Sequence, residues 1–423
     1  MLALRLTRGA RTAVQLRRLL VAAASAGTGF LLLCALGHAM SHPADPTASL
    51  LRLAWCTPPL AATVYFSTAV ARTDPATTPR PGLSAVGLGP ARLMLVSATT
   101  TALATTLGST VALLLFLYLR GDLTGLPFDG TGADYLAAAR PLPVPGTLTL
   151  LAIVPTTATA ATAWVLRPRT ADAARPRHGA TDADASPPGR WSAGVRPARA
   201  AWVSSPPAPD HPPAPTPAAD KANPLAALPW GIATLAAGLA VETYASRAED
   251  PTPVPLPGGL AASPTGLLTG WILTAVGLAL TGPGLTHLTG RLLQSARPGA
   301  LRLLAGRVLM AEAPRIGRPL GLVCAVASAA YATTALHDSS APSLGPLTTL
   351  GALVVAGCTV ATLLTAAVET KQARTDTTAA LLRLGAPATV LRSAAALRAT
   401  ALLAVFAPLT LLVAELATRP LSA

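Results

Sequence analysis

The sequence predicts an all-α protein whose helices form a polytopic transmembrane bundle. Three observations lead to this fold class. Hydrophobic residues make up 51% of the 423 positions and charged residues only 12%, and the mean hydropathy of +0.51 exceeds that of an average soluble domain. Apolar runs of about 20 residues recur along the chain, which is the length a helix needs to cross about 30 Å of hydrocarbon. Basic residues, finally, concentrate in alternate connections between these runs.

The apolar runs predict nine membrane-spanning helices. Each run can cross lipid because a helix satisfies its own backbone hydrogen bonds. We place the spans at residues 19–39, 51–71, 93–119, 146–166, 224–241, 260–287, 319–336, 344–368 and 393–414.

The distribution of Lys and Arg predicts the orientation of the spans. With a cytoplasmic N-terminus, the inner connections hold 27 of the 32 basic residues. The outer side then holds only Arg52, Arg120, Arg140, Arg247 and Arg419. Cytoplasmic loops of membrane proteins carry an excess of Lys and Arg, so we expect the N-terminus inside and the C-terminus outside.

Composition divides the chain into three parts. Residues 167–223 are rich in Pro, Ala and Arg and bury too little apolar surface to fold alone, which predicts a disordered cytoplasmic linker. Residues 1–166 form an N-terminal half with four predicted spans, and residues 224–423 form a C-terminal half with five.

A weak internal repeat relates the two halves. Ala-Arg-Thr-Asp begins a segment at Ala71 and again at Ala373, and each segment leads into a long apolar run. A glycine and then a proline follow in both segments: Gly87, Pro90, Gly385 and Pro387. We therefore expect two inner connections of one design.

The second copy predicts a short cytoplasmic elbow helix that is rigidly joined to the last span. At 100° per residue, a stripe of small or apolar residues lies beside a polar stripe. The first contains Ala373, Thr377, Ala380 and Leu384, and the second contains Glu369, Gln372, Asp376 and Arg383. Such a helix can lie on the inner rim of a membrane. Gly385 can take the left-handed conformation that ends it, and Pro387 suits the first turn of the next helix.

The elbow segment resembles the inner loop of FtsX-like ABC transporter permeases. That loop carries a Leu-Leu-Arg and Leu-Gly-Ala signature before a long helix, and the matching residues here are Leu381, Leu382, Arg383, Leu384, Gly385 and Ala386. Residues 290–329 look like the inner loop and following helix of the long actinobacterial form of these permeases, and residues 83–92 contain a weaker copy of the elbow.

The resemblance implies a non-enzymatic permease subunit in the plasma membrane that works with a separate ABC ATPase dimer. In this family the ATPase grips the elbow helices and couples ATP binding to movement of the spans, for export, extraction of lipophilic molecules or mechanical signalling. The sequence contains no G-x-x-x-x-G-K-[ST] phosphate loop, so the ATPase must be another chain. The lipid bilayer and a second permease copy or homologue are the other implied partners, and no cofactor is implied.

The resemblance also implies coupling roles for individual residues. Leucines would fill a groove of the partner, Arg383 and Asp376 would set the pairing, and Gly385 would fix the bend. The full set is Arg374, Asp376, Leu381, Leu382, Arg383, Leu384, Gly385 and Ala386, with Leu83, Gly87 and Pro90 in the weaker copy.

Other residues predict packing rather than chemistry, and no catalytic or metal site is expected. The net charge of +14 is scattered among loops instead of forming a basic patch with aromatic residues, which disfavours nucleic-acid binding. The Ser- and Thr-rich segment 97–110 is expected to let helices approach closely. The cysteines lie inside apolar runs and are expected to be buried packing thiols: Cys34, Cys56, Cys324 and Cys358.

Two other classes of protein stay open as alternatives. The short outer connections suit a non-transporting membrane scaffold or sensor subunit. An ATP-independent secondary transporter would need an ionisable or polar site near the membrane midplane. The charges within or beside the spans lie near span ends, where snorkelling to water is expected for Arg398, Glu242 and Glu415.

Overall fold

The described part of the chain is helical. The computed structural model describes residues 2–73, 90–122, 136, 138, 140–167, 225–247, 264–295, 299–337, 345–383, 385 and 387–422, and no strand occurs within these ranges. The all-α prediction is therefore confirmed. In these ranges, seven helices are long and apolar enough to cross a membrane.

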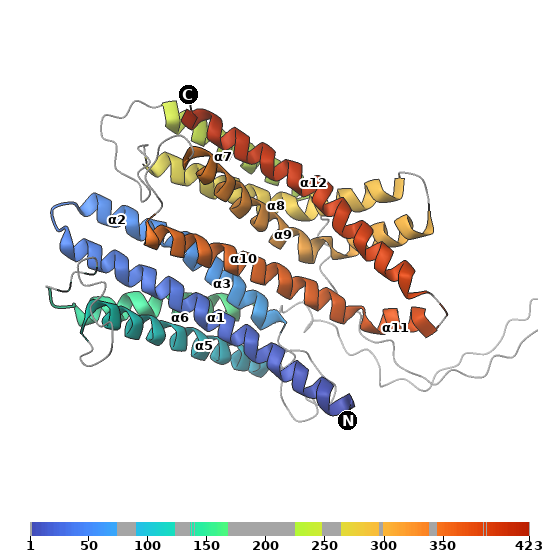
Figure 1. Cartoon of the computed structure of the whole chain (residues 1–423), viewed down its shortest axis with the longest axis horizontal. Coiled ribbons are helices and arrows are strands. Elements are labelled where there is room, and N and C mark those ends of the chain that lie inside the picture. Colours follow the sequence, from blue (N-terminus) through green and yellow to red (C-terminus); the bar gives the residue numbers. More distant parts are fainter. Residues whose placement is uncertain are drawn as a thin grey trace, which may run out of the picture. The chain divides into compact units, whose positions relative to one another are not determined.

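The helices follow the predicted spans in order (Figure 1). Their bounds are α1 (Leu2–Ser41), α2 (Pro46–Trp55), α3 (Thr57–Arg72), α5 (Pro90–Arg120), α6 (Val144–Val165), α7 (Leu228–Arg247), α8 (Pro264–Ser295), α9 (Ala300–His337), α10 (Pro346–Ala373), α11 (Thr375–Arg383) and α12 (Ala388–Ser422). The seven long apolar helices are α1, α5, α6, α8, α9, α10 and α12.

Two predicted spans differ from this set. Residues 51–71 do not form one helix, because the chain breaks at Cys56 between α2 and α3. Pro58 and Pro59 cause the break, since neither has the backbone N–H that would bond to the preceding turn. The predicted span 224–241 corresponds to α7, which contains Glu242 and is not among the seven long apolar helices.

The predicted inner connection 288–318 is helical over most of its length. α8 continues to Ser295 and α9 begins at Ala300, so the two helices form a hairpin that extends past the predicted span ends. Gly290 and Gly306 explain why they stay packed there: a Cβ on Gly306 would lie 2.5 Å from the carbonyl oxygen of Gly290. Close backbone contact stabilises a helix pair even where the sequence lacks a long apolar run.

The helices pack into two groups that are joined by α10. α1, α3, α5 and α6 pack on one another and are called the N-terminal helix group. α7, α8, α9 and α12 pack on one another and are called the C-terminal helix group. α10 packs on α1 and α3 of the first group and on α9 of the second. The helix therefore comes from the predicted C-terminal half but contacts the N-terminal half extensively.

Buried side chains fill the N-terminal helix group. Phe30 of α1 and Phe116 of α5 meet edge to face, with ring centroids 6.3 Å apart. The Ser25 hydroxyl of α1 donates a hydrogen bond to the Thr105 carbonyl of α5 at 2.8 Å. A Cβ on Gly108 would lie 2.2 Å from the Ala22 carbonyl oxygen, so α1 and α5 are in backbone contact. The close approach predicted for segment 97–110 is confirmed.

Glycines bring the backbones of the C-terminal helix group together. A Cβ on Gly282 of α8 would lie 2.0 Å from the carbonyl oxygen of Gly317 in α9, and one on Gly321 would lie 2.1 Å from that of Leu278. A Cβ on Gly238 of α7 or on Gly270 of α8 would likewise lie too close to atoms of the other helix. These helices therefore pack backbone against backbone, as is common where lipid offers no hydrophobic drive for association.

Both predicted halves belong to one structural unit. Met1–Arg167 and Asn223–Ala423 form that unit, and Pro168–Ala222 form another, which lies outside the described residues. The expected linker thus also lies outside them, and the division into two FtsX-like halves stays a prediction.

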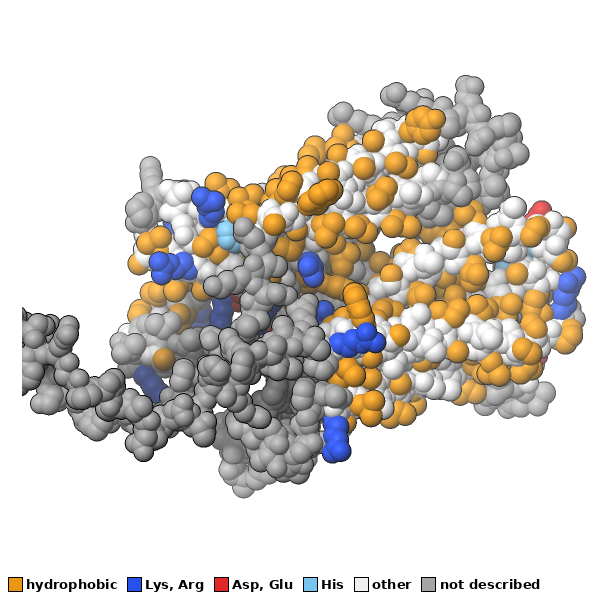
Figure 2. Space-filling model, turned by 180° about the vertical axis from the view of Figure 1, so that it is seen from behind, with side chains coloured by type: hydrophobic (Ala, Val, Ile, Leu, Met, Phe, Trp, Pro, Cys, Tyr) orange, Lys and Arg blue, Asp and Glu red, His pale blue; other side chains and the backbone are white. Residues whose placement is uncertain are grey.

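The outward surface of the helices is apolar. Figure 2 shows hydrophobic side chains over much of the described surface that faces the viewer. Leu103 of α5 is 71% exposed and Leu353 of α10 is 70% exposed. Large apolar patches of this kind are rare on soluble monomers and fit contact with lipid.

Candidate functional site

The predicted elbow is a nine-residue helix, α11, between α10 and α12. The structure differs from the prediction in one respect: the helix does not run on from Glu369, because the chain turns at Arg374. Arg374 is the C-cap of α10, with φ −101° and ψ −2°. Its carbonyl accepts the backbone N–H of Thr378 at 2.8 Å and the Thr378 hydroxyl at 2.7 Å, so α11 starts from this residue.

Gly385 forms the bend between α11 and α12. Its φ of +86° lies in the left-handed region, as the sequence predicts. Pro387 stands immediately before α12, and its carbonyl accepts the N–H of Val390 at 3.0 Å. The bend is thus made by a residue type that adopts this backbone conformation without strain.

Arg374 is turned into the helix bundle and pairs with Glu312 of α9. The Arg374 Nη2 and Glu312 Oε1 atoms form an ion pair, and the Arg398 Nη1 atom of α12 lies 3.8 Å from Glu312 Oε2. Glu312 is buried, at 9% exposure. These three residues, Glu312, Arg374 and Arg398, are called the carboxylate cluster.

Arg374 stays charged near neutral pH although its surroundings lower its pKa. Burial, followed by repulsion from Arg398, lowers the pKa of Arg374 from its ordinary value to about 10. This pKa is still far above neutrality, so the cluster contains one carboxylate between two guanidinium groups. Such a network can hold the three helices together.

The described side chains of α11 include three that are exposed. Thr375, Ala380 and Arg383 are exposed. Arg383 lies in the last turn, where its charge interacts favourably with the helix dipole. The backbones of Asp376, Leu381 and Leu382 lie in α11, but their side chains are outside the described residues, as are Leu384 and Ala386 entirely.

The weaker copy of the elbow lies mostly outside the described residues. Leu83 and Gly87 lie outside the described residues, and Pro90 is the first residue of α5. A proline at the first position of a helix is favoured because its missing N–H would have no partner there.

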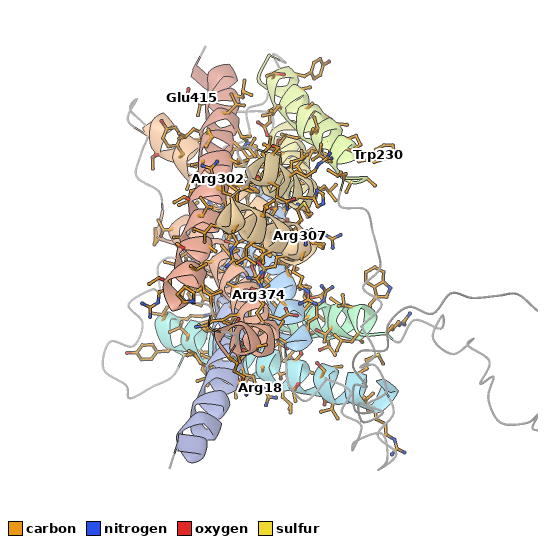
Figure 3. All side chains as sticks on the ribbon, turned by 90° about the vertical axis from the view of Figure 1, so that its right-hand side faces the viewer. Arg18, Trp230, Arg302, Arg307, Arg374 and Glu415 are labelled. Carbon is orange, nitrogen blue, oxygen red and sulfur yellow. The ribbon has the colours of Figure 1, made fainter. Side chains whose placement is uncertain are left out.

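The α11 end of the helices also carries exposed arginines. Figure 3 views the molecule from this end and labels Arg18 of α1, Arg302 and Arg307 of α9, and Arg374. Arg302 and Arg307 are exposed on the α8–α9 hairpin beside exposed Leu301. This end of the helices therefore carries at least three exposed arginines, Arg18, Arg302 and Arg307.

Glu312 is the residue of this site that the sequence reasoning missed. A signal for it was present. It is the only carboxylate in the segment 288–318, which contains six arginines. A lone acid among many bases points to an ion pair, but the sequence does not say with which base.

Two span-end charges do not snorkel as predicted. Glu242 is 2% exposed, and its Oε1 accepts a hydrogen bond from the Thr274 hydroxyl of α8 at 3.0 Å. It is held inside because Gly270 of α8 leaves room for its side chain. Arg398 is partly buried and faces Glu312 instead of water. Glu415 is exposed.

The remaining polar groups offer no ligand set. No group of three His, Cys, Asp or Glu side chains that could hold a metal ion occurs in the described ranges. All four cysteines are buried and free, as predicted.

The comparisons with known proteins leave the family open. No family model, no curated protein and no solved structure matches this chain.

Proposed function

We propose that this protein is the permease subunit of an ABC transporter of the FtsX-like type, working with a separate ATPase dimer. The observation that carries the proposal is the position of α11. This short helix begins at α10, which packs on the N-terminal helix group, and leads into α12 of the C-terminal helix group. A partner that displaces α11 therefore acts on both groups at once.

The exposed side of α11 is where the ATPase would bind. Arg383, with the leucines Leu381 and Leu382, would occupy the partner's groove, and Gly385 would hold α11 at a constant angle to α12. Arg374 would act within the permease, because its charge is paired with Glu312. ATP binding would then favour one arrangement of the helices, as in other ligand-driven population shifts.

The proposal includes nine spans with the N-terminus in the cytoplasm and the C-terminus outside the plasma membrane. The seven long apolar helices support a multi-pass membrane protein, and the exposed arginines at the α11 end of the helices support a cytoplasmic position for that end. A cysteine in place of exposed Thr375 should react with a membrane-impermeant maleimide only after the cells are permeabilised. Labelling of intact cells would contradict this topology.

The decisive test replaces residues of α11 in the full-length protein. Arg383→Glu and Gly385→Val should each leave membrane insertion intact, but should reduce co-purification of the ATPase or the coupling of its ATP hydrolysis to the permease. Arg52→Glu makes the same charge change in α2, at an exposed residue distant in sequence from α11, and is the matched control. Unchanged binding and coupling in both α11 variants would refute the elbow assignment. Recovery of another protein without any ATPase would favour the scaffold or sensor alternative.

Glu242 favours a second candidate, an ATP-independent transporter. Ionisable side chains buried between transmembrane helices commonly mark proton or ion pathways. Glu242 is buried against α8, and its Oε2 atom has no hydrogen-bond partner in the described structure. If this candidate is right, transport persists without the ATPase and is lost in Glu242→Gln but kept in Glu415→Gln, which removes an exposed carboxylate.

A further inference from the structure

Glu312 connects three helices that are distant along the chain. Its Oε1 atom pairs with Arg374 at the junction of α10 and α11, and its Oε2 atom lies 3.8 Å from Arg398 of α12. The carboxylate itself belongs to α9. Glu312 of α9 thus contacts the start of the elbow and the helix α12 that follows it, although α9 has no direct covalent link to either.

The connection matters because α10 and α12 both contact α9 but otherwise pack on different helices. α10 packs on α3, α1 and α9, whereas α12 packs on α9, α7 and α8. The chain segment that joins α11 to α12 transmits a displacement of α11 to α12, but it does not reach α9. Without the carboxylate cluster, α9 would follow the elbow only through helix packing.

We propose that Glu312 is a positioning residue that makes α9 move together with the elbow. With both ion pairs formed, α11, the start of α12 and the basic end of α9 move as one body. The source of the displacement rests on the proposed function, whereas the link between α9 and α11 does not.

The physical basis of the link is the burial of the carboxylate. Glu312 is 9% exposed, and the Arg374 and Arg398 side chains are only 28% and 20% exposed. Charges that are shielded from water interact strongly, and removing one partner leaves the others buried without compensation. Neutralising Glu312 would leave two guanidinium groups facing each other, which should push α12 and the α10–α11 junction away from α9.

The test measures the distance between α9 and α11 by pulsed electron paramagnetic resonance, in the full-length protein in lipid nanodiscs. Spin labels are placed at exposed Ala311→Cys in α9 and Thr375→Cys in α11, and the native cysteines, which are buried, are kept. The expected result is a single narrow distance distribution in the wild-type background. Glu312→Gln, which keeps the size of the side chain, should broaden it or shift it to longer distances.

Three controls separate the link from general loss of structure. Glu415→Gln removes an exposed carboxylate of α12 and should leave the distribution unchanged. A label pair at exposed Trp230→Cys in α7 and Leu292→Cys in α8 should stay unchanged in Glu312→Gln. Arg374→Gln also breaks the ion pair between α9 and the elbow and should broaden the distribution, with an effect that does not add to that of Glu312→Gln.

The outcomes are distinct. An unchanged α9–α11 distribution in Glu312→Gln overturns the proposal, as does an equal change in the α7–α8 pair, which would give the carboxylate a general structural role. If Glu312→Gln does not yield folded protein, Arg398→Gln serves in its place, since it removes one of the two ion pairs and should broaden the distribution less.

A second measurement uses the ATPase. In the co-reconstituted complex, nucleotide should leave the α9–α11 distance of the wild type unchanged, because the two helices move together, and Glu312→Gln should reduce the nucleotide-stimulated ATP hydrolysis about tenfold while ATPase binding persists. If no ATPase binds the wild type, the proposed function fails but the distance result stands. If coupling is unchanged in Glu312→Gln, the inference about Glu312 fails alone.

Discussion

In the N-terminal helix group, side chains fill the space between helices, whereas in the C-terminal helix group the backbones themselves are in contact. Phe30 and Phe116 form the centre of a hydrophobic cluster in the first group. In the second, a Cβ on any of several glycines would overlap a neighbouring backbone: Gly231, Gly238, Gly277, Gly282, Gly306, Gly317 and Gly321. Among the described glycines of the first group, Gly108 is the one that makes such a contact.

The two helix groups also differ in the charged residues that they bury. Among the described residues, the buried carboxylates Glu242 and Glu312 both lie in the C-terminal helix group, and the buried charge of the N-terminal group is Arg120 at the end of α5. Backbone contact brings helices close enough to enclose a carboxylate completely. The C-terminal helix group thus combines close backbone packing with buried carboxylates.

The largest effect should come from truncating the aromatic core of the N-terminal helix group. Phe116 is fully buried, so Phe116→Ala should lower the free energy of unfolding by about 4 kcal/mol through loss of contacts and formation of a cavity. Denaturation of the purified protein in detergent measures it. Leu103→Ala, at a position that is 71% exposed, is the control and should change little. Equal losses in both variants would contradict the assignment of the core.

A smaller loss should follow from enlarging a glycine of the C-terminal helix group. Gly321→Ala places a Cβ 2.1 Å from the Leu278 carbonyl oxygen, and separating the two backbones should cost about 2 kcal/mol. The matched control is Gly357→Ala in α10, where no atom lies within 4 Å of the added Cβ. Thermal unfolding of both variants decides the question, and a stable Gly321→Ala would show that α8 and α9 do not pack through their backbones.

The hydroxyl contacts between helices should contribute least to stability. Ser25→Ala removes the 2.8 Å hydrogen bond to the Thr105 carbonyl, and interhelical bonds of this kind average about 0.6 kcal/mol in membranes. Ser393→Ala removes a hydroxyl that bonds only within its own helix and should have a still smaller effect. A loss above about 2 kcal/mol for Ser25→Ala would mean that this bond organises the whole group.

The contribution of Arg374 to stability should be insensitive to pH near neutrality. The pKa of Arg374 is lowered to about 10, chiefly by burial, so folding disfavours its protonated form and stability linked to this group rises only as the pH approaches and passes that value. The difference in unfolding free energy between wild type and Arg374→Gln should therefore stay constant from about pH 6 to pH 8. A marked slope in that range would show that a member of the cluster titrates there.

Local features of this chain could be predicted without its structure. The long apolar runs indicated the helices, because hydrophobicity over about 20 residues is a property of one segment alone. The helix before Gly385, its positive φ and the start of α12 after Pro387 followed from the backbone preferences of single residues. The break at Cys56 was also present in the sequence, in the two prolines that follow it.

Relations between distant helices could not be predicted. The sequence alone determined where most of the long apolar helices lie and where the elbow bends. Only the tertiary structure decided that α10 packs on α3 and α1, and that Glu312 pairs with Arg374 and Arg398 rather than with another of the many arginines. The physical reason is that lipid and neighbouring helices are equally apolar, so hydrophobicity does not choose among partners. Close backbone contacts and buried charges make that choice, and both depend on residues that meet only when the helices are assembled.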